Sequence, residues 1–298
     1  MTTTTDTVPS TGLRPRRSVL YMPGANERAL EKAKGIPADA LILDLEDAVA
    51  PDAKAGARAN VCAAAQSGDY GHREIAIRVN SIGTEWHDDD LAAAAAAGPD
   101  AILVPKVDSA DEVTRLEAAL VAAKAPDHTK LWAMLETPNA LLDARAIAAA
   151  SARLTVLVLG TNDIAKELHA AQNAGRAELV PAITGCLIGA RAAGKVIIDG
   201  VYNDIGDPEG FRAECVQGRD LGFDGKTLIH PSQVEPCNDV WAPTAEAVDD
   251  ARELIATFDT AIAEGKGVVT YKGRMIENLH VDNARRVIAM ADAIAAHG

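Results

Sequence analysis

Two acidic residues stand where apolar segments of the chain end, and both have the chemistry to hold a divalent cation. Glu136 follows the run Leu131–Leu135, and Asp163 follows the run Thr155–Leu159 after a short turn. Neither has a histidine or cysteine among its immediate neighbours. Mg²⁺ prefers oxygen ligands and needs only one or two protein carboxylates, because water and substrate complete its coordination. The sequence therefore predicts Mg²⁺ at Glu136 and Asp163; the alternative is that one of them pairs with a nearby Arg or Lys.

A second group of charged residues combines two acids with an arginine. Glu46 and Asp47 end one apolar run, and Arg78 lies within another. An arginine in an apolar strand needs an anionic partner, so Arg78 is expected to bind a substrate carboxylate or an internal acid such as Glu46. Glu46 and Asp47 are expected either to hold water on the metal or to pair with Arg78 or Lys106.

Lys106 follows Pro105 at the end of a further apolar run. A lysine in such a place forms a Schiff base in some aldolases, but that chemistry needs a lowered pKa. The surrounding carboxylates would raise the pKa of this ammonium instead. A salt bridge is therefore the predicted role of Lys106.

A regular series of short apolar runs would position these residues. Within each run apolar residues follow one another without alternating with polar ones, as in parallel strands covered on both faces. The predicted strands are Ser18–Met22, Ala40–Leu45, Glu74–Val79, Ala101–Pro105, Leu131–Leu135, Thr155–Leu159, Lys195–Ile198 and Gly225–Ile229. Segments with helical spacing lie between them, including Glu27–Lys34, Asp52–Gln66, Ala110–Lys124 and Pro208–Leu221. Eight strand-then-helix units predict a TIM barrel, and a doubly wound sheet is the alternative. In a barrel the charged residues that end these runs share the face that carries the chemistry.

The chain is expected to have three parts. Residues 1–15 are Thr- and Pro-rich and are predicted to be a disordered tail, and residues 16–240 hold the barrel. Residues 241–298 contain two expected helices, Thr244–Glu264 and Leu279–Ala296, around a glycine-containing break at Gly265–Gly273. A helical extension of this kind caps the barrel, contacts a neighbouring subunit or forms a lid over the site.

Composition excludes several classes of protein. The 298 residues carry 29 Lys+Arg against 43 Asp+Glu, a net charge of −14, which argues against a nucleic-acid-binding surface. No apolar run approaches the roughly 20 residues of a membrane span. Four scattered cysteines without a metal-binding spacing are expected to be free buried thiols, and the N-terminus lacks the apolar core of a signal peptide. The protein is therefore expected to be cytoplasmic.

Several further residues have two possible roles. Arg28 and Lys32 are four residues apart, so they lie on one helical face, where they either receive ligand phosphates or are solvated surface charges. Asn162, beside Asp163 in a glycine-led turn, is placed with the substrate-binding residues. His230 begins a His-Pro pair and is either structural or a ligand contact.

Six ordered motifs resemble the citrate lyase β-subunit-like (CitE-like) superfamily, which includes malyl-CoA and citramalyl-CoA lyases. They are Arg17-Ser-Val-Leu-Tyr-Met-Pro-Gly24, Asp44-Leu-Glu-Asp-Ala-Val49, Arg78-Val-Asn80, Pro105-Lys106, Leu135-Glu-Thr137 and the segment from Gly222 to Gln233. The resemblance implies a TIM barrel, a trimer or hexamer, Mg²⁺ and a short-chain acyl-CoA. It also implies that Glu136 and Asp163 bind the metal and that Arg78 holds the carboxylate of a 2-oxo acid. Tyr21 and Lys32 correspond to CoA contacts, and Ile229 and His230 border the thioester.

The resemblance also implies retro-Claisen cleavage of a malyl-CoA-type 3-hydroxyacyl-CoA to a 2-oxo acid and an acyl-CoA, which is the leading expectation. In the lyases an Asp in the lid, often from a neighbouring subunit, is the general base, whereas this chain has Glu277. Glu277 could activate water instead, as in the malyl-CoA thioesterase branch, so hydrolysis to malate and CoA is the first alternative. An HpaI-like pyruvate aldolase and a non-catalytic subunit that needs an acyl-carrier partner are further alternatives.

Overall fold

Eight parallel strands form one sheet that curves into a barrel. The computed structural model describes residues 13–297, so the predicted disordered tail lies outside the described residues as far as residue 12. The strands are β1 (Ser18–Pro23), β2 (Ala40–Asp44), β3 (Glu74–Arg78), β4 (Ala101–Val104), β5 (Lys130–Leu135), β6 (Leu154–Leu159), β7 (Val196–Ile198) and β8 (Lys226–Leu228). Their order in the sheet is β7-β6-β5-β4-β3-β2-β1-β8, and a parallel bridge between Asp199 and Lys226 joins its two edges. The TIM barrel predicted from the sequence is confirmed.

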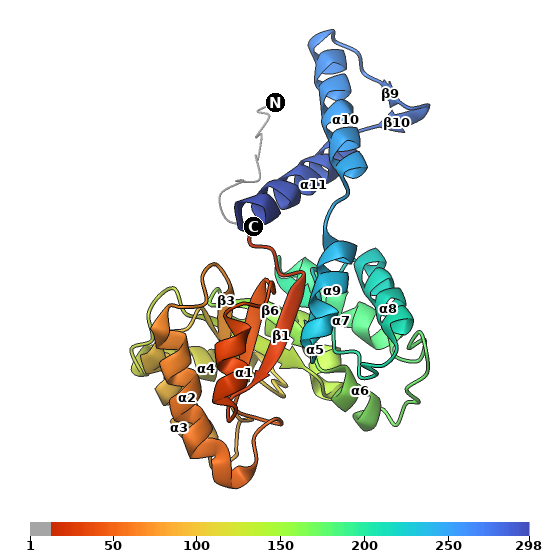
Figure 1. Cartoon of the computed structure of the whole chain (residues 1–298). Helices are drawn as coiled ribbons and strands as arrows, with labels where there is room; N and C mark the ends of the chain where they lie inside the picture. The colour runs from red at the N-terminus through yellow and green to blue at the C-terminus, as the bar shows by residue number, and fades with distance from the viewer. Residues whose placement is uncertain (1–12, 298) are drawn as a thin grey trace. The chain divides into compact units, whose positions relative to one another are not determined.

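Helices follow the strands along the chain (Figure 1). In this part they are α1 (Glu27–Ala33), α2 (Lys54–Ser67), α3 (His87–Ala97), α4 (Ala110–Ala122), α5 (Pro138–Ala149), α6 (Thr161–Glu167), α7 (Val180–Ala192), α8 (Pro208–Leu221) and α9 (Val234–Trp241). Short 3₁₀ turns precede α2 (Pro51–Ala53) and α9 (Pro231–Gln233). Side chains of Asn26, Ser109, Thr137 and Asp207 accept a backbone N–H at the start of α1, α4, α5 and α8. These polar caps fix where each helix begins after its strand.

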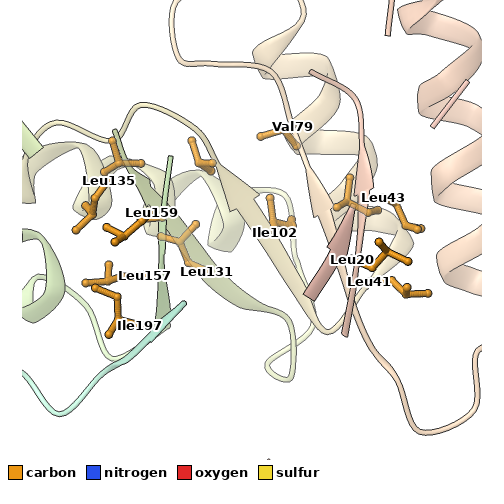
Figure 2. Packing of buried hydrophobic residues seen from close by; sticks show 14 of the residues in the cluster. Leu20, Leu41, Leu43, Val79, Ile102, Leu131, Leu135, Leu157, Leu159 and Ile197 are labelled. Atoms are coloured by element: carbon orange, nitrogen blue, oxygen red, sulfur yellow. The ribbon is translucent and has the colours of Figure 1, made fainter. Parts of the chain in front are cut away.

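The strands separate two apolar layers because successive side chains point to opposite faces. One layer faces the helices and includes Leu20, Leu41, Leu43, Ile102 and Leu157, all fully buried (Figure 2). The other fills the barrel interior and is built from alternate residues of the same strands: Val19, Ala40, Ile42, Ala76, Ala101, Leu103, Trp132, Met134, Val156, Val158 and Ile198. A filled interior leaves the rims of the barrel as the place for a site.

A buried network of charges holds the two edges of the sheet together. Asp199, which is fully buried, accepts hydrogen bonds from Arg176 at 2.6 and 2.8 Å and from Lys226 at 3.1 Å. Lys226 also donates to Glu214 of α8 at 2.6 Å. The two cations lower the pKa of Asp199 despite its burial. In the described part of the chain, only one β-bridge joins β7 and β8, in contrast to the several paired residues between the other neighbouring strands, and this network holds the two strands together.

Residues from Ala242 onward belong to a second compact unit, separate from the unit Arg16–Trp241. It contains α10 (Ala245–Ala263), β9 (Val269–Tyr271), β10 (Arg274–Ile276) and α11 (Asn278–His297). Ala261, Val269, Tyr271 and Ile276 form its small core. The helices are interrupted at Gly265–Gly273 as expected, and the second part of this break begins an antiparallel hairpin that turns at Lys272 and Gly273 with φ of 46° and 77°. Among the described residues, no helix has the length and apolar character needed to cross a membrane.

Candidate active site

The carboxyl ends of the barrel strands enclose a cavity of about 310 Å³. It is lined by Tyr21, Asp44, Asp47, Ala48, Arg78, Met134, Glu136, Leu159, Gly160, Thr161, Asn162, Asp163, Val201, Thr227 and Ile229. Most of the residues singled out in the sequence therefore meet at one rim. This is the rim of a TIM barrel at which loop and strand-end side chains perform catalysis.

Arg78 is held by an acid on the neighbouring strand. Arg78 and Asp44 are register partners in the β2–β3 pair, and the guanidinium donates from Nε and Nη2 to the two Asp44 oxygens, each at 2.7 Å. The same oxygens accept the backbone N–H groups of Glu46 at 2.8 Å and Ala48 at 3.1 Å. Asp44 and its acidic neighbours outweigh the effect of burial, so the pKa of Arg78 is raised well above its ordinary value. The bidentate pair fixes one edge of the guanidinium plane.

The remaining Nη1 nitrogen of Arg78 faces two further acids. It lies 2.7 Å from Glu46 Oε2 and 3.3 Å from Asp47 Oδ2. Of the two roles expected for Glu46 and Asp47, the structure therefore shows ion pairing with Arg78. Glu46 is buried, which raises the pKa of its carboxyl, whereas the side chain of Asp47 is 71% exposed.

Glu136 lies in a pocket made by a glycine. A Cβ on Gly160 would come within 2.1 Å of Glu136 Oε2, so only glycine leaves room for this carboxylate. Glu136 Oε1 accepts the backbone N–H of Lys106 at 2.9 Å. Burial raises the pKa of Glu136 to about 7, and Lys106 opposes that rise only in part. A carboxyl group with this pKa is only partly ionised at physiological pH, and a nearby cation stabilises its ionised form.

The Lys106 ammonium forms the predicted salt bridges. Its Nζ lies 3.7 Å from Glu46 Oε1, 3.7 Å from Asp163 Oδ1 and 4.0 Å from Glu136 Oε1. Because these acids raise the pKa of Lys106 against the effect of its partial burial, Schiff-base chemistry is disfavoured here. The shared contact also shows that Glu136 and Asp163 face one small space.

The residues at this space fit Mg²⁺. Glu46 Oε2 is buried and lacks a hydrogen-bond partner among the described residues, because its close contact with Arg78 does not have hydrogen-bond geometry. Residues 13–297 contain no group of three or more His, Cys, Asp or Glu side chains arranged as a complete metal cage. A pair of carboxylates supplemented by water and substrate is the coordination that Mg²⁺ tolerates and Zn²⁺ does not favour.

The ring of Tyr21 packs against the guanidinium of Arg78. Its ring lies 4.8 Å from the Arg78 guanidinium carbon, and its hydroxyl contacts Met134 Sδ at 3.8 Å. A cation over an aromatic face is stabilised by the ring quadrupole. The observed contacts of Tyr21 therefore hold Arg78, and contact with CoA remains a prediction for this residue.

Three other predicted residues lie on the rim itself. Asn162 exchanges hydrogen bonds with Asn203 at 3.2 and 2.7 Å, and Ile229 contributes a 38%-exposed apolar side chain. His230 Nδ1 contacts Ser232 Oγ at 2.7 Å and accepts the Ser232 N–H at 3.2 Å, so the histidine begins the turn that follows β8. The structural role of His230 is thus shown, and a ligand role for it remains a prediction.

Lys32 and Glu277 lie outside the cavity lining. Lys32 is exposed in the last turn of α1. Glu277 is exposed in the second unit, just after β10, and its backbone N–H donates to His280 Nδ1 at 3.0 Å. Both stay predicted contributors to CoA binding and catalysis.

A family model described as HpcH/HpaI aldolase/citrate lyase matches residues 17–231. The chain belongs to this family. The resemblance to the CitE-like superfamily is thereby confirmed. The (3S)-malyl-CoA thioesterase of Cereibacter sphaeroides is 52% identical over 95% of this chain and 96% of the relative. The L-malyl-CoA/beta-methylmalyl-CoA lyase of the same organism is 34% identical over 97% of this chain and 98% of the relative.

A similar solved structure agrees with the barrel. The crystal structure of protein CitE from Mycobacterium tuberculosis in complex with magnesium, acetoacetate and coenzyme A has a TM-score of 0.76 to this chain at 28% identity. The match covers 92% of this chain and 97% of that one. A protein with a similar fold has thus been crystallised in complex with magnesium.

Asp44 is the main site residue to which the sequence assigned no role. The signal was present, because Asp44 and Arg78 are each the last residue but one of two predicted strands that follow one another along the chain. Only the register, which makes the two residues direct neighbours, shows that they form the bidentate pair. Thr161 and Thr227, which also line the cavity, carry no comparable signal in the sequence.

Proposed function

We propose that this protein is a Mg²⁺-dependent thioesterase that hydrolyses (3S)-malyl-CoA to malate and CoA. One observation carries the choice of reaction: the thioesterase relative shares 52% of aligned residues, whereas the lyase relative shares 34%. This reverses the order of the two activities expected from the sequence, in which carbon–carbon cleavage came first. Glu277, which replaces the Asp of the lyases, points the same way.

The barrel rim supplies the binding groups for such a substrate. Glu136 and Asp163 would hold Mg²⁺, which as a Lewis acid favours negative charge that develops on substrate oxygens. Arg78 would bind the free carboxylate of the malyl group through Nη1, the edge that Asp44 does not occupy. Glu46 and Asp47 would then move off Nη1, since one nitrogen cannot pair with all three carboxylates.

The proposed hydrolysis needs a base and a water molecule. Glu277 would take a proton from a water molecule, and the oxygen of that water would attack the thioester carbonyl carbon. The C–S bond then breaks, CoA leaves with the electron pair of that bond, and the proton passes to the thiolate. Donors preorganised around the carbonyl oxygen would stabilise the charge that forms there.

Product analysis in ¹⁸O-labelled water tests this proposal. The protein is incubated with (3S)-malyl-CoA and Mg²⁺, and the products are separated and weighed by mass spectrometry. Hydrolysis yields free CoA and malate with one ¹⁸O in the new carboxylate. Glyoxylate and acetyl-CoA would show the lyase instead, and turnover of neither bond in any malyl-type CoA ester would overturn the proposal.

A matched pair of variants tests whether Glu277 determines which of the two reactions the enzyme performs. Glu277→Gln is expected to abolish hydrolysis, whereas Glu277→Asp is expected to lower it and raise cleavage, because the carboxylate retreats by about 1.5 Å. His280→Gln, which changes the acceptor of the Glu277 backbone N–H, separates the effect of the position of Glu277 from that of its carboxylate. Turnover of a CoA ester by the purified chain would also exclude the alternative that the protein is a non-catalytic subunit that needs an acyl-carrier partner. If CoA esters do not bind, the alternative of an HpaI-like pyruvate aldolase would be favoured.

The assembly and location of the enzyme are part of the proposal. Relatives of this kind are expected to form trimers or hexamers, with the C-terminal extension as a lid that serves either its own site or a neighbour's. Mixing Glu277→Gln and Arg78→Lys chains tests this: recovered activity would show that the two residues act across subunits. A cytoplasmic location agrees with a CoA-ester substrate.

A further inference from the structure

Lys106 places a positive charge at the centre of three carboxylates that come from three different parts of the barrel. Its Nζ is 3.7 Å from Glu46 Oε1, 3.7 Å from Asp163 Oδ1 and 4.0 Å from Glu136 Oε1. These are ion-pair separations, too long for a hydrogen bond. The ammonium is therefore shared almost evenly by the three acids, as a bound cation would be.

The backbone holds Lys106 there at a cost. Lys106 has φ of 51°, in the left-handed region that residues with a side chain seldom adopt. Its N–H donates to Glu136 Oε1 at 2.9 Å, and the next N–H, of Val107, donates to Met134 O at 3.3 Å. Glu136 thus fixes the backbone of Lys106 at the same time as it attracts the ammonium.

The side chain of Lys106 is free to leave this position. It is 39% exposed, in contrast to the buried lysines Lys54 and Lys226 of the barrel. A flexible, partly solvated lysine can move its charge into water with little loss of free energy. A divalent cation at the same carboxylates would repel it.

We propose that the Lys106 ammonium, which also pairs with Glu46, is an internal counter-ion that competes with the divalent cation for Glu136 and Asp163 and moves into solvent when the cation binds. The inference rests on the proposed Mg²⁺ site. It differs from a purely structural salt bridge, in which the ammonium would stay between the carboxylates when Mg²⁺ binds. In the metal-free protein the ion pairs offset part of the negative charge of these acids, and the competition lowers the affinity of the site for Mg²⁺.

Calorimetric titration with Mg²⁺ alone tests the competition. Lys106→Met keeps the apolar stem and removes the charge, and it is expected to bind Mg²⁺ at least about tenfold more tightly than the unaltered protein. Lys166→Met is the matched control, because Lys166 is an exposed lysine on α6, the helix that carries Asp163. Equal or weaker binding by Lys106→Met would overturn the inference, as would equal tightening by Lys166→Met.

A second measurement uses the unaltered chain, in case Lys106→Met does not fold. A brief pulse of acetic anhydride with and without Mg²⁺, read by peptide mass spectrometry, reports how accessible the Lys106 amine is. Mg²⁺ should increase acetylation of Lys106 severalfold relative to Lys166, and no increase would contradict the displacement. If the unaltered chain binds no Mg²⁺, the metal site of the proposed function fails and this inference with it. If it binds Mg²⁺ without either effect, only the inference fails.

Discussion

Asp44 and Arg78 are direct neighbours across the β2–β3 pair, and their side chains form a bidentate ion pair with both distances at 2.7 Å. Asp44 is almost completely buried, and its oxygens also accept two backbone N–H groups. The orientation of the arginine thus follows from strand register. Under the proposed function, the substrate carboxylate would therefore meet an Arg78 whose orientation is already fixed.

Asp44→Asn is expected to lower kcat/KM by about a hundredfold, because the guanidinium loses the partner that orients it. Removing one member of a buried pair also lowers the free energy of unfolding by about 3 kcal/mol. Asp39→Asn is the matched control, since Asp39 forms a similar bidentate pair with Arg17, with distances of 2.9 and 2.8 Å, at the start of β1 and β2. Steady-state kinetics and urea unfolding should show stability loss in both variants and the large kinetic loss in Asp44→Asn alone.

Glu136→Gln and Asp163→Asn are each expected to abolish Mg²⁺-dependent turnover while the barrel stays folded. Each change removes one of the two proposed carboxylate ligands and keeps the size of the side chain. Circular dichroism confirms folding, and calorimetry with Mg²⁺ measures binding. Full activity in either variant would remove that residue from the metal site.

The raised pKa of Glu136 makes stability depend on pH when no cation is bound. The folded protein holds this proton up to about pH 7, whereas the ordinary pKa of the group is 4.5. Because the folded state binds more protons between these values, the contribution of Glu136 to stability is present below about pH 4.5 and is lost as the pH rises through about 7.

Urea unfolding in EDTA at several pH values measures this contribution as the difference between the unaltered protein and Glu136→Gln. The variant should gain stability relative to the unaltered protein from pH 5 to pH 8. The affinity for Mg²⁺ should rise over the same interval and level off above pH 7, as the proton no longer competes. Glu235→Gln, an exposed change on α9, serves as control. A difference that is independent of pH would show that Glu136 is ionised throughout.

Gly160→Ala is expected to weaken Mg²⁺ binding by at least about tenfold, because the new Cβ would lie 2.1 Å from Glu136 Oε2 and push that carboxylate away. Gly185→Ala provides the contrast. A Cβ on Gly185, within α7, meets nothing within 4 Å, so this change should stabilise the protein by about 1 kcal/mol and leave binding unchanged. Calorimetry on both variants measures the effect, and undiminished binding by Gly160→Ala would mean that Glu136 can ligate from another position.

The sequence predicted the barrel well because parallel strands covered on both faces have continuous apolar runs. Every predicted strand is present, and no end differs from its predicted position by more than one residue, as at Val104 instead of Pro105. The β9–β10 hairpin was missed because each of its strands has three residues, too few to show an alternation. The Lys272-Gly273 pair at its turn was the only local sign of a hairpin in the sequence.

For the site, the sequence indicated which charged residues were candidates, and the structure showed which of them form ion pairs with one another. Glu136, Asp163 and Lys106 were found from their places at strand ends, and the Lys106 salt bridge was predicted correctly. The partner of Arg78 could not be settled, because several acids follow β2 and only the register makes Asp44 its neighbour. The pocket that Gly160 provides for Glu136 depends on the close approach of two strands, which no single segment reveals.

Diffraction at the manganese absorption edge, from crystals grown with Mn²⁺ in place of Mg²⁺, shows directly whether Glu136 and Asp163 hold a divalent cation. We expect one strong anomalous peak about 2.2 Å from carboxylate oxygens of both residues, with the Lys106 ammonium turned toward solvent. A peak bound by neither acid, or an ordered Lys106 still between them at saturating Mn²⁺, would contradict this expectation.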